Sequence, residues 1–254
     1  MDRLASVALP GNGGRRLNLH AQIVRELGLR ILSGAFRPGA ALPIESDLGR
    51  ELGVSRSILR EAIKSLAAKG LVTSRPRVGT HVRNPRDWNL LDPDVLAWRY
   101  ETMPPMDFFR DLFDIRRVVE PAAAELAAEK AQPADLAVLD AACTAMEQAD
   151  PTSDSAIEAD VAFHRGILTA SHSELLGQLG MLIGVGLLIS FRISTRFYPA
   201  SLPHHRPVLE AIRRHQPNKA KAAMQTLLSE TFRDIERKLT ESSGTIRKQK
   251  PTAA

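Results

Sequence analysis

Cysteine is almost absent from this chain of 254 residues, which contains Cys143 alone. A single thiol excludes a framework of disulfides within the chain and a zinc site built from several cysteines. Aromatic residues are also scarce, at 5%, whereas alanine, leucine, arginine and glutamate are plentiful, and this composition favours helix. With 44% hydrophobic residues, the chain has enough apolar side chains to form a globular core.

Long apolar segments are missing as well. The longest, Met181–Phe191, is interrupted by Gly184, Gly186 and Ser190 and is too short to cross a bilayer. No apolar segment typical of a signal peptide follows Arg3. We therefore expect a cytoplasmic protein without a membrane partner.

The charge of the chain is unevenly distributed. Residues 1–84 contain 14 lysines and arginines against 6 acidic residues, whereas residues 85–254 contain 20 against 23. A basic N-terminal third followed by a mildly acidic remainder indicates a polyanion-binding module joined to a separate body. Many ordinary pairs of domains differ in net charge by this much, so the charge distribution alone supports that interpretation equally well.

Breaks in the hydrophobic pattern divide the chain into five parts. Residues 1–16, which contain a glycine cluster, are predicted to be a flexible tail, and the polar residues 241–254 a frayed one. Prolines punctuate residues 85–105, which we expect to be a linker with one short helix. The two domains are then residues 17–84 and residues 106–240.

The two domains differ in their predicted elements. The first contains three helices and a β-hairpin, which is the element order of a winged helix-turn-helix, and the second shows helical periodicity throughout. The predicted fold class is therefore mainly α, with a small hairpin wing in the first domain and an all-α bundle in the second. The predicted helices lie at 19–31, 45–52, 55–69, 107–131, 133–149, 154–171, 173–196, 203–215 and 217–240, and the strands at 71–74 and 80–82.

The third helix is the candidate element for reading DNA. In a helix-turn-helix, the N-terminal residues of this helix meet base edges in the major groove. Here those residues are Ser55, Arg56, Ser57 and Arg60. Arg56 and Arg60 are four residues apart and share a face, and arginine is well shaped to grip guanine or phosphate.

The hairpin adds two further arginines. Arg75 and Arg77 lie at its tip, where they are placed for contacts with phosphate or with the minor groove. The alternative is that the arginines of the helix and the hairpin form a solvated face, but the order of the elements favours DNA.

An ordered series of short motifs runs through this domain: Gly34–Gly39, Leu42–Glu45, Leu48, Gly53–Arg56, Leu59–Ala62, Leu66, Gly70–Val72 and Gly79–Thr80. In this series, residues 31–82 resemble the DNA-binding domain of GntR-type bacterial regulators. The resemblance implies that Arg56 and Arg60 contact operator DNA, as do wing residues from Arg75 to Thr80, Gly79 included. The family often has arginine where this chain has Ser46, so we expect one contact to be weakened or shifted.

Polar residues interrupt the apolar stripes of the second domain. Residues three or four apart share a helix face, which places Asp160 and His164 on one apolar stripe and His205 and Arg116 on two others. An unpaired polar group inside a core is costly, so a ligand pocket explains the four residues better than a simple core. The alternative for Asp160 and His164 is a salt bridge on a partly buried face.

Three segments carry a second resemblance: Ile115–Ala123, Asp160 with His164, and His205–Ile212. In these segments, residues 106–240 resemble the FCD ligand-binding domain of the FadR branch of the GntR family. In that branch an aspartate and three histidines commonly bind a divalent metal, on which the carboxylate of the effector docks. The resemblance implies Asp160, His164 and His205 as metal ligands, whereas Leu227 stands where the last histidine is expected.

Two arrangements of this site stay open. Three protein ligands with a water or the effector hold Zn²⁺ or another divalent metal such as Ni²⁺. In a pocket without metal, Arg116 pairs with the carboxylate of the effector in a bidentate manner, and His164 and His205 hydrogen-bond its hydroxyls. The segment Pro85–Trp98 resembles the corresponding segment of galactonate-operon repressors in this branch, which also lack the last histidine. It implies a sugar-acid effector such as an aldonate.

The sequence thus predicts a DNA-binding transcriptional regulator that acts as a homodimer on a palindromic operator. By family habit it is a repressor, here of a sugar-acid catabolic operon, and a small carboxylate bound to the helical domain releases it from DNA. One alternative is a metal-dependent hydrolase that uses Asp160, His164 and His205 with a metal-bound water, although no general base is in place. Another is an architectural DNA-binding protein without effector, which leaves the buried polar residues unexplained.

Overall fold

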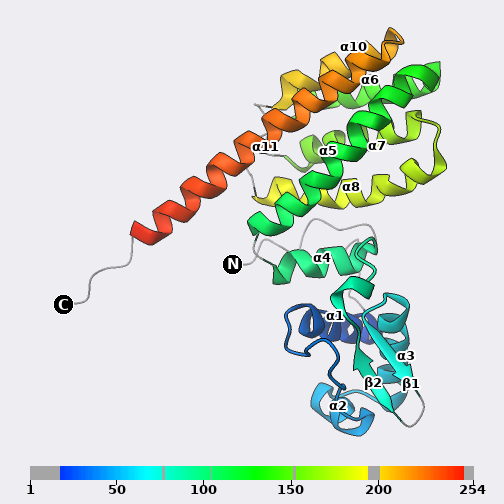
Figure 1. The fold of residues 1–254 in the computed structure, drawn as a ribbon, viewed down its shortest axis with the longest axis vertical. Coiled ribbons are helices and arrows are strands. Elements are labelled where there is room, and N and C mark those ends of the chain that lie inside the picture. Colours follow the sequence, from blue (N-terminus) through cyan, green and yellow to red (C-terminus); the bar gives the residue numbers. More distant parts are fainter. Residues whose placement is uncertain (1–17, 76–77, 104, 151–152, 194–200, 249–254) are drawn as a thin grey trace. The chain divides into compact units, whose positions relative to one another are not determined.

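The structure is a computed structural model that describes residues 18–75, 78–103, 105–150, 153–193 and 201–248. The chain is divided into two compact units, which are residues 1–104 and residues 105–254. Helices dominate both units, and a two-stranded antiparallel sheet follows the first three helices (Figure 1). The predicted class, mainly α with a hairpin wing and a helical C-terminal domain, is confirmed.

The first unit has the elements of a winged helix. They are α1 (Leu19–Leu32), α2 (Glu45–Leu52), α3 (Arg56–Ala68), β1 (Val72–Arg75) and β2 (Gly79–Val82). Gly53 ends α2 in the left-handed conformation, at φ 66°, which glycine adopts without steric cost. The side chain of Ser55 then caps α3 by accepting a hydrogen bond from the backbone N–H of Ile58.

The hairpin closes over the core of this unit. Its register pairs Val72 with Val82 and Arg75 with Gly79. Both valines are buried, in one cluster with the apolar faces of the three helices. Alternation along the strands therefore turns one face of the hairpin inward and leaves its tip exposed.

Residues 85–105, which we expected to be a linker, belong largely to the first unit. They form a short 3₁₀ helix, η1 (Pro85–Asp87), and α4 (Pro93–Thr102), which packs against α1. Trp98 is buried beside Gly28, where an added Cβ would lie 2.5 Å from the indole ring. Nζ of Lys69 lies 2.9 Å from a carboxylate oxygen of Asp92. Apolar burial and this ion pair fix α4 to the helices of the first unit.

The second unit is a helical bundle. Its elements are α5 (Pro105–Lys130), α6 (Pro133–Gln148), α7 (Asp154–Ala170), α8 (Glu174–Ile193), η2 (Leu202–His204), α10 (His205–Arg213) and α11 (Pro217–Lys248). The helices α5 and α11 run side by side, and α7 contacts α5, α6 and α8 (Figure 1). Its core contains Phe113, Phe163, Ile167, Val208 and Met224. In the part of the chain that the structure describes, no helix is long and apolar enough to cross a membrane.

The clearest differences from the prediction in this unit are the length of α11 and the division of the helix predicted at 203–215. α11 continues to Lys248 rather than ending at 240, because no proline interrupts the segment and helical hydrogen bonding continues through it. The helix predicted at 173–196 corresponds to α8 (Glu174–Ile193), and its predicted last residues, 194–196, lie outside the described residues. The helix predicted at 203–215 is divided between η2 and α10.

Candidate functional site

The N-terminal end of α3 presents the predicted DNA-reading residues to solvent. Ser55, Arg56, Ser57 and Arg60 are all exposed. The hydroxyls of Ser55 and Ser57 lie 2.9 Å apart. Nε of Arg60 donates to Oε2 of Glu45 at 2.7 Å, which ties this arginine to the first turn of α2. The end of the helix and its two arginines are therefore free of the core and available to a DNA groove.

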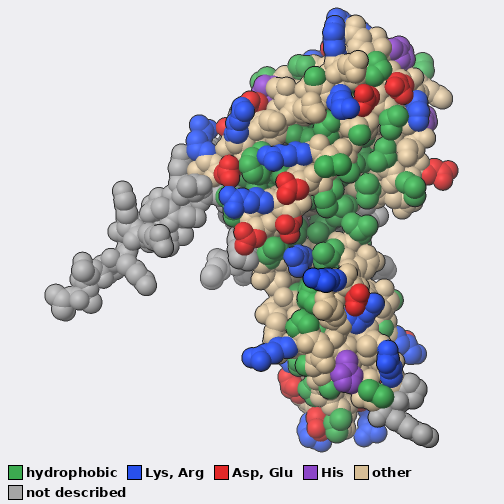
Figure 2. Space-filling view, in the orientation of Figure 1, with side chains coloured by type: hydrophobic (Ala, Val, Ile, Leu, Met, Phe, Trp, Pro, Cys, Tyr) green, Lys and Arg blue, Asp and Glu red, His purple; other side chains and the backbone are tan. Residues whose placement is uncertain are grey.

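The wing supplies a second exposed group. Arg75 and Gly79 face one another across the end of the hairpin, and Thr80 donates from its Oγ1 to Oγ of Ser74 at 3.2 Å. Gly79 has φ 95°, a conformation that glycine allows. Arg77, the other predicted wing contact, lies outside the described residues. Lys and Arg side chains are distributed over the visible face of this unit (Figure 2).

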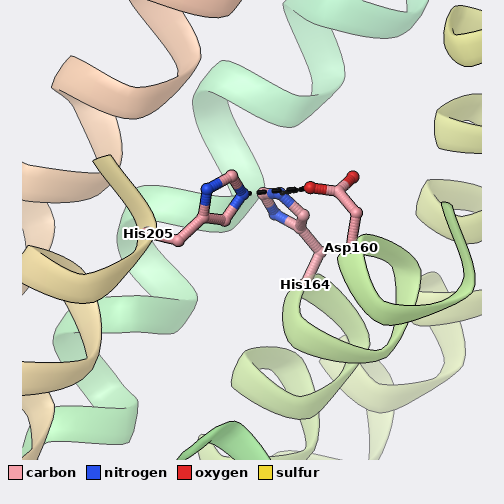
Figure 3. A group of neighbouring side chains, drawn as sticks. All are labelled: Asp160, His164 and His205. Atoms are coloured by element: carbon pink, nitrogen blue, oxygen red, sulfur yellow. Dashed lines mark ion pairs between the residues drawn. The ribbon is translucent and has the colours of Figure 1, made fainter. Parts of the chain in front are cut away.

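The second unit brings all four predicted effector and metal residues into its buried interior. Arg116 comes from α5, Asp160 and His164 come from α7, and His205 is the first residue of α10. All four are buried, with Arg116 only 1% exposed. The side chains of Asp160, His164 and His205 converge on one point (Figure 3). One candidate ligand atom from each of these three residues lies within 4.8 Å of the other two.

Oδ1 of Asp160 is the shared centre of these three residues. It lies 3.0 Å from Nε2 of His205 and 3.8 Å from Nε2 of His164. Spacings of this size between one carboxylate oxygen and two imidazole nitrogens suit a cation that binds all three.

The hydrogen bonding of His205 supports the same interpretation. Its Nδ1 lies 3.1 Å from the carbonyl oxygen of Ser201 and 3.3 Å from that of Leu202. A carbonyl only accepts, so Nδ1 carries the proton, and in the neutral ring Nε2 has a lone pair. That Nε2 is buried and makes no hydrogen bond, despite its distance to Asp160. An oxygen and a nitrogen lone pair that face each other repel, so this pair requires either a proton on Nε2 or a metal cation between the two atoms.

Glu120 is the member of this site that the sequence analysis missed. It is fully buried on α5, one turn after Arg116, whose Nε donates to its Oε1 at 2.5 Å. Its Oε2 makes a short hydrogen bond with Nδ1 of His164. The available signal was its spacing of four residues from Arg116, within the segment that carries the FCD resemblance.

The two carboxylates of the site are ionised. Burial by itself raises the pKa of Glu120, but the charges of Arg116 and His164 and their hydrogen bonds outweigh it and hold that pKa at about 2. Burial likewise raises the pKa of Asp160, and the nearby His164, His205 and Arg116 bring it below its ordinary value. One arginine faces these two carboxylates, so protons on the imidazoles or a bound cation balance the remaining negative charge.

Two further observations describe the surroundings of this site. Nη1 of Arg116 is buried and has no hydrogen-bond partner, while its Nη2 lies 3.5 Å from Nε2 of His164. Leu227, at the position expected for the last histidine, is buried in the apolar core of the bundle. The site therefore combines three candidate metal ligands with a guanidinium that has a free donor.

Comparison with known sequences matches both units. Bacterial regulatory proteins of the gntR family match residues 19–82, and the FCD domain matches residues 111–230. The galactonate operon transcriptional repressor of Escherichia coli (strain K12) is 32% identical over 223 residues, which are 86% of this chain and 97% of the repressor. The uncharacterized HTH-type transcriptional regulator YieP of the same strain is 35% identical over 215 residues, 83% of this chain and 93% of YieP.

A solved structure shows the same fold. Lar, which controls the expression of the Listeria monocytogenes agr system, has a TM-score of 0.61 to this chain at 20% identity. The match covers 88% of this chain and 99% of that chain.

An exposed winged helix joined to a helical domain, together with these matches, defines a transcriptional regulator. The chain belongs to the GntR family, in the branch whose C-terminal domain is an FCD domain. It is a DNA-binding regulator and not an enzyme, because the relatives it matches are transcriptional regulators. The hydrolase alternative has no support among them.

Proposed function

We propose that this regulator represses a sugar-acid catabolic operon and leaves its operator when an aldonate or a similar small carboxylate binds the FCD domain. In this proposal a homodimer reads a palindromic operator. The protein then acts in the cytoplasm, where the operator DNA lies. The contacts with DNA come from Ser55, Arg56, Ser57, Arg60, Arg75, Arg77, Gly79 and Thr80.

The observation that carries the proposal is the partnerless Nη1 of Arg116. A charged donor that is buried without an acceptor is costly, and the carboxylate of an effector supplies the missing acceptor. Such a charge-assisted hydrogen bond is about twice as strong as a neutral one. Because Nε of Arg116 is already held by Glu120, the guanidinium is oriented before the effector arrives.

We further propose that the three-ligand cluster holds Zn²⁺ or another divalent metal. Asp160 would contribute Oδ1, and His164 and His205 would each contribute Nε2, the atoms that already lie together. When bound, the ion would supply a positive charge for the carboxylate or a hydroxyl of the effector. The two carboxylates that face a single arginine and the partnerless Nε2 of His205 support this assignment.

The choice of a sugar acid rests on the relatives. The galactonate operon transcriptional repressor matches this chain over nearly its whole length. An aldonate offers a carboxylate for Arg116 and hydroxyls for imidazoles or a metal, so its chemistry suits the donors present.

The test is a thermal-shift screen of galactonate, other aldonates and dicarboxylates, with and without Zn²⁺. A ligand at 100 times its Kd adds about 2.7 kcal/mol of stability. A stabilising aldonate should also release the protein from operator fragments that it has selected from random DNA. The proposal is wrong if no sugar acid stabilises the protein in either condition, and the dependence on Zn²⁺ separates the metal site from a metal-free pocket.

A further inference from the structure

Glu120 is a fully buried charged residue that has two different hydrogen-bond partners. It receives a hydrogen bond from Arg116, one turn earlier on α5, and one from His164, which lies 44 residues further along the chain on α7. Its side chain is 0% exposed. Each carboxylate oxygen therefore has its own donor, and one donor belongs to the candidate effector group while the other belongs to the candidate metal ligand.

We infer that Glu120 is a positioning residue, which fixes the tautomer of His164 and the orientation of Arg116 and so sets both halves of the effector site. The inference rests on the proposed function of that site as a place for a metal and a carboxylate.

The consequence for His164 concerns its two nitrogens. An ionised carboxylate only accepts hydrogen bonds, so Nδ1 of His164 must carry a proton to bond Oε2 of Glu120. In the neutral ring, Nε2 then keeps its lone pair, and this is the atom that faces Oδ1 of Asp160 at 3.8 Å. Metal-binding histidines are held by an outer carboxylate in the same manner, which fixes the ring and raises the basicity of the ligand atom.

The consequence for Arg116 concerns the direction of its guanidinium. Glu120 accepts from Nε, and the guanidinium also lies 4.9 Å from the ring centroid of Phe113. With these two contacts in place, Nη1 remains without a partner in the buried site. Because one carboxylate holds both Arg116 and His164, the carboxylate-binding group and the metal-binding group keep a fixed separation.

Replacement of Glu120 by glutamine makes this role measurable. Glutamine has nearly the same shape, but it offers one oxygen and one NH₂ group to two donors. The oxygen is needed by Arg116, since an unpaired buried charge costs more than an unpaired neutral group. The NH₂ group then faces Nδ1 of His164, which must become an acceptor. The proton moves to Nε2, and the lone pair that faces the metal site is lost.

The first measurement is the tautomer of His164, read from the ¹⁵N chemical shifts of its ring in the full-length protein without metal, at a pH where the ring is neutral. We expect a proton on Nδ1 in the wild type and on Nε2 in Glu120→Gln. Glu129→Gln is the matched control, because Glu129 is an exposed residue on the same helix, and it should leave the wild-type tautomer unchanged. If Glu120 had only a structural role, Glu120→Gln would not move the ring proton of His164 from one nitrogen to the other.

The second measurement is the affinity for Zn²⁺, titrated against a competing chelator. Loss of an outer carboxylate typically weakens metal binding by about 10–100-fold, so we expect a loss of that size in Glu120→Gln and none in Glu129→Gln. The inference is overturned if wild-type His164 carries its proton on Nε2, a result that needs no variant. It is also overturned if Glu120→Gln folds and keeps both the tautomer and the affinity.

Neither measurement uses DNA or an effector. A protein that shows the predicted tautomers and Zn²⁺ affinities but is never released from its operator by sugar acids would refute the proposed function alone. A protein that responds to sugar acids but has the opposite tautomer would refute the role of Glu120 alone.

Discussion

Single residues determine the charge balance of the buried site. Arg116, Glu120 and Asp160 are held away from water, and removing one partner of such a pair costs about 3–5 kcal/mol. Substitutions that keep the charge therefore separate a role in binding from a role in folding, and they are the sharper test here.

Arg116→Lys should bind operator DNA like the wild type but require more effector for release. Lysine keeps the positive charge beside Glu120 but lacks the planar fork that grips a carboxylate. The lost charge-assisted hydrogen bond is worth about 1.5–3 kcal/mol, so the effector concentration for half-release should rise about tenfold to a hundredfold. The measurement is operator release against effector concentration. The exposed Arg110→Lys on the same helix should behave like the wild type, and an unchanged release curve for Arg116→Lys would contradict its role.

Glu120 makes the stability of the protein depend on acidity. Its pKa in the folded chain is about 2, below the ordinary value of 4.5, so the ionised form favours the folded state. This contribution, about 3 kcal/mol, is fully present above about pH 4.5 and is lost as the pH falls toward 2. We expect the free energy of unfolding, from denaturant titrations followed by circular dichroism, to fall less steeply with acidification in Glu120→Gln than in the wild type. Equal slopes would show that Glu120 is not the group responsible.

Leu227→His should tighten the binding of Zn²⁺ if this position is the vacant fourth ligand site. We expect an increase of at least about tenfold, which corresponds to 1.4 kcal/mol, measured by titration with a competing chelator. Leu227→Met preserves the size of the side chain without adding an imidazole and should bind Zn²⁺ like the wild type. A wild-type protein that already holds one metal tightly, and a histidine variant that changes nothing, would refute this assignment.

At the scale of elements, α3 is the helix whose start is set by local sequence signals and whose first turns carry the proposed DNA contacts. Its beginning is set by Gly53 and Ser55, and its exposed first turns carry Arg56 and Arg60. Arg60 is additionally held by Glu45 of α2, so the helix proposed to read DNA and the helix before it are linked by an ion pair.

Arg56→Ala and Arg60→Ala should each abolish specific operator binding without unfolding the first unit. Both side chains are exposed, so their removal costs no core packing, whereas each lost base or phosphate contact costs about 1–3 kcal/mol. Fluorescence anisotropy with labelled operator measures the affinity, and circular dichroism measures the fold. Arg233→Ala removes the same charge from an exposed position on α11 and should leave operator affinity unchanged. Wild-type affinity in both α3 variants would exclude this helix as the reader.

Local signals predicted the elements well and their packing less well. Gly53 and Ser55 act within a few residues, so the turn between α2 and α3 could be predicted from the sequence. The attachment of α4 could not, because it depends on Trp98 meeting Gly28 of a distant helix. The role of Glu120 could not be predicted for the same reason, since its burial and its second hydrogen bond require α7 to pack against α5. Apolar periodicity did identify Asp160, His164, His205 and Arg116 as buried residues.

For the whole molecule, we predict a homodimer both free and on DNA. Two half-sites of a palindromic operator need two copies of the winged helix related by a two-fold axis. Light scattering with and without an operator fragment measures the mass directly. A monomeric mass in both conditions would contradict the prediction.

The burial of Trp98 has an optical consequence. Trp88 and Trp98 are the two tryptophans of the chain, and both lie in the DNA-binding unit. Tryptophan emission, excited at a wavelength that tyrosine does not absorb, therefore reports on that unit alone, whereas the proposed effector site, with Arg116 and His164, lies in the other. An aldonate that shifts or quenches this emission at saturating concentration would show, without any label, that a signal received in one half of the protein arrives in the other.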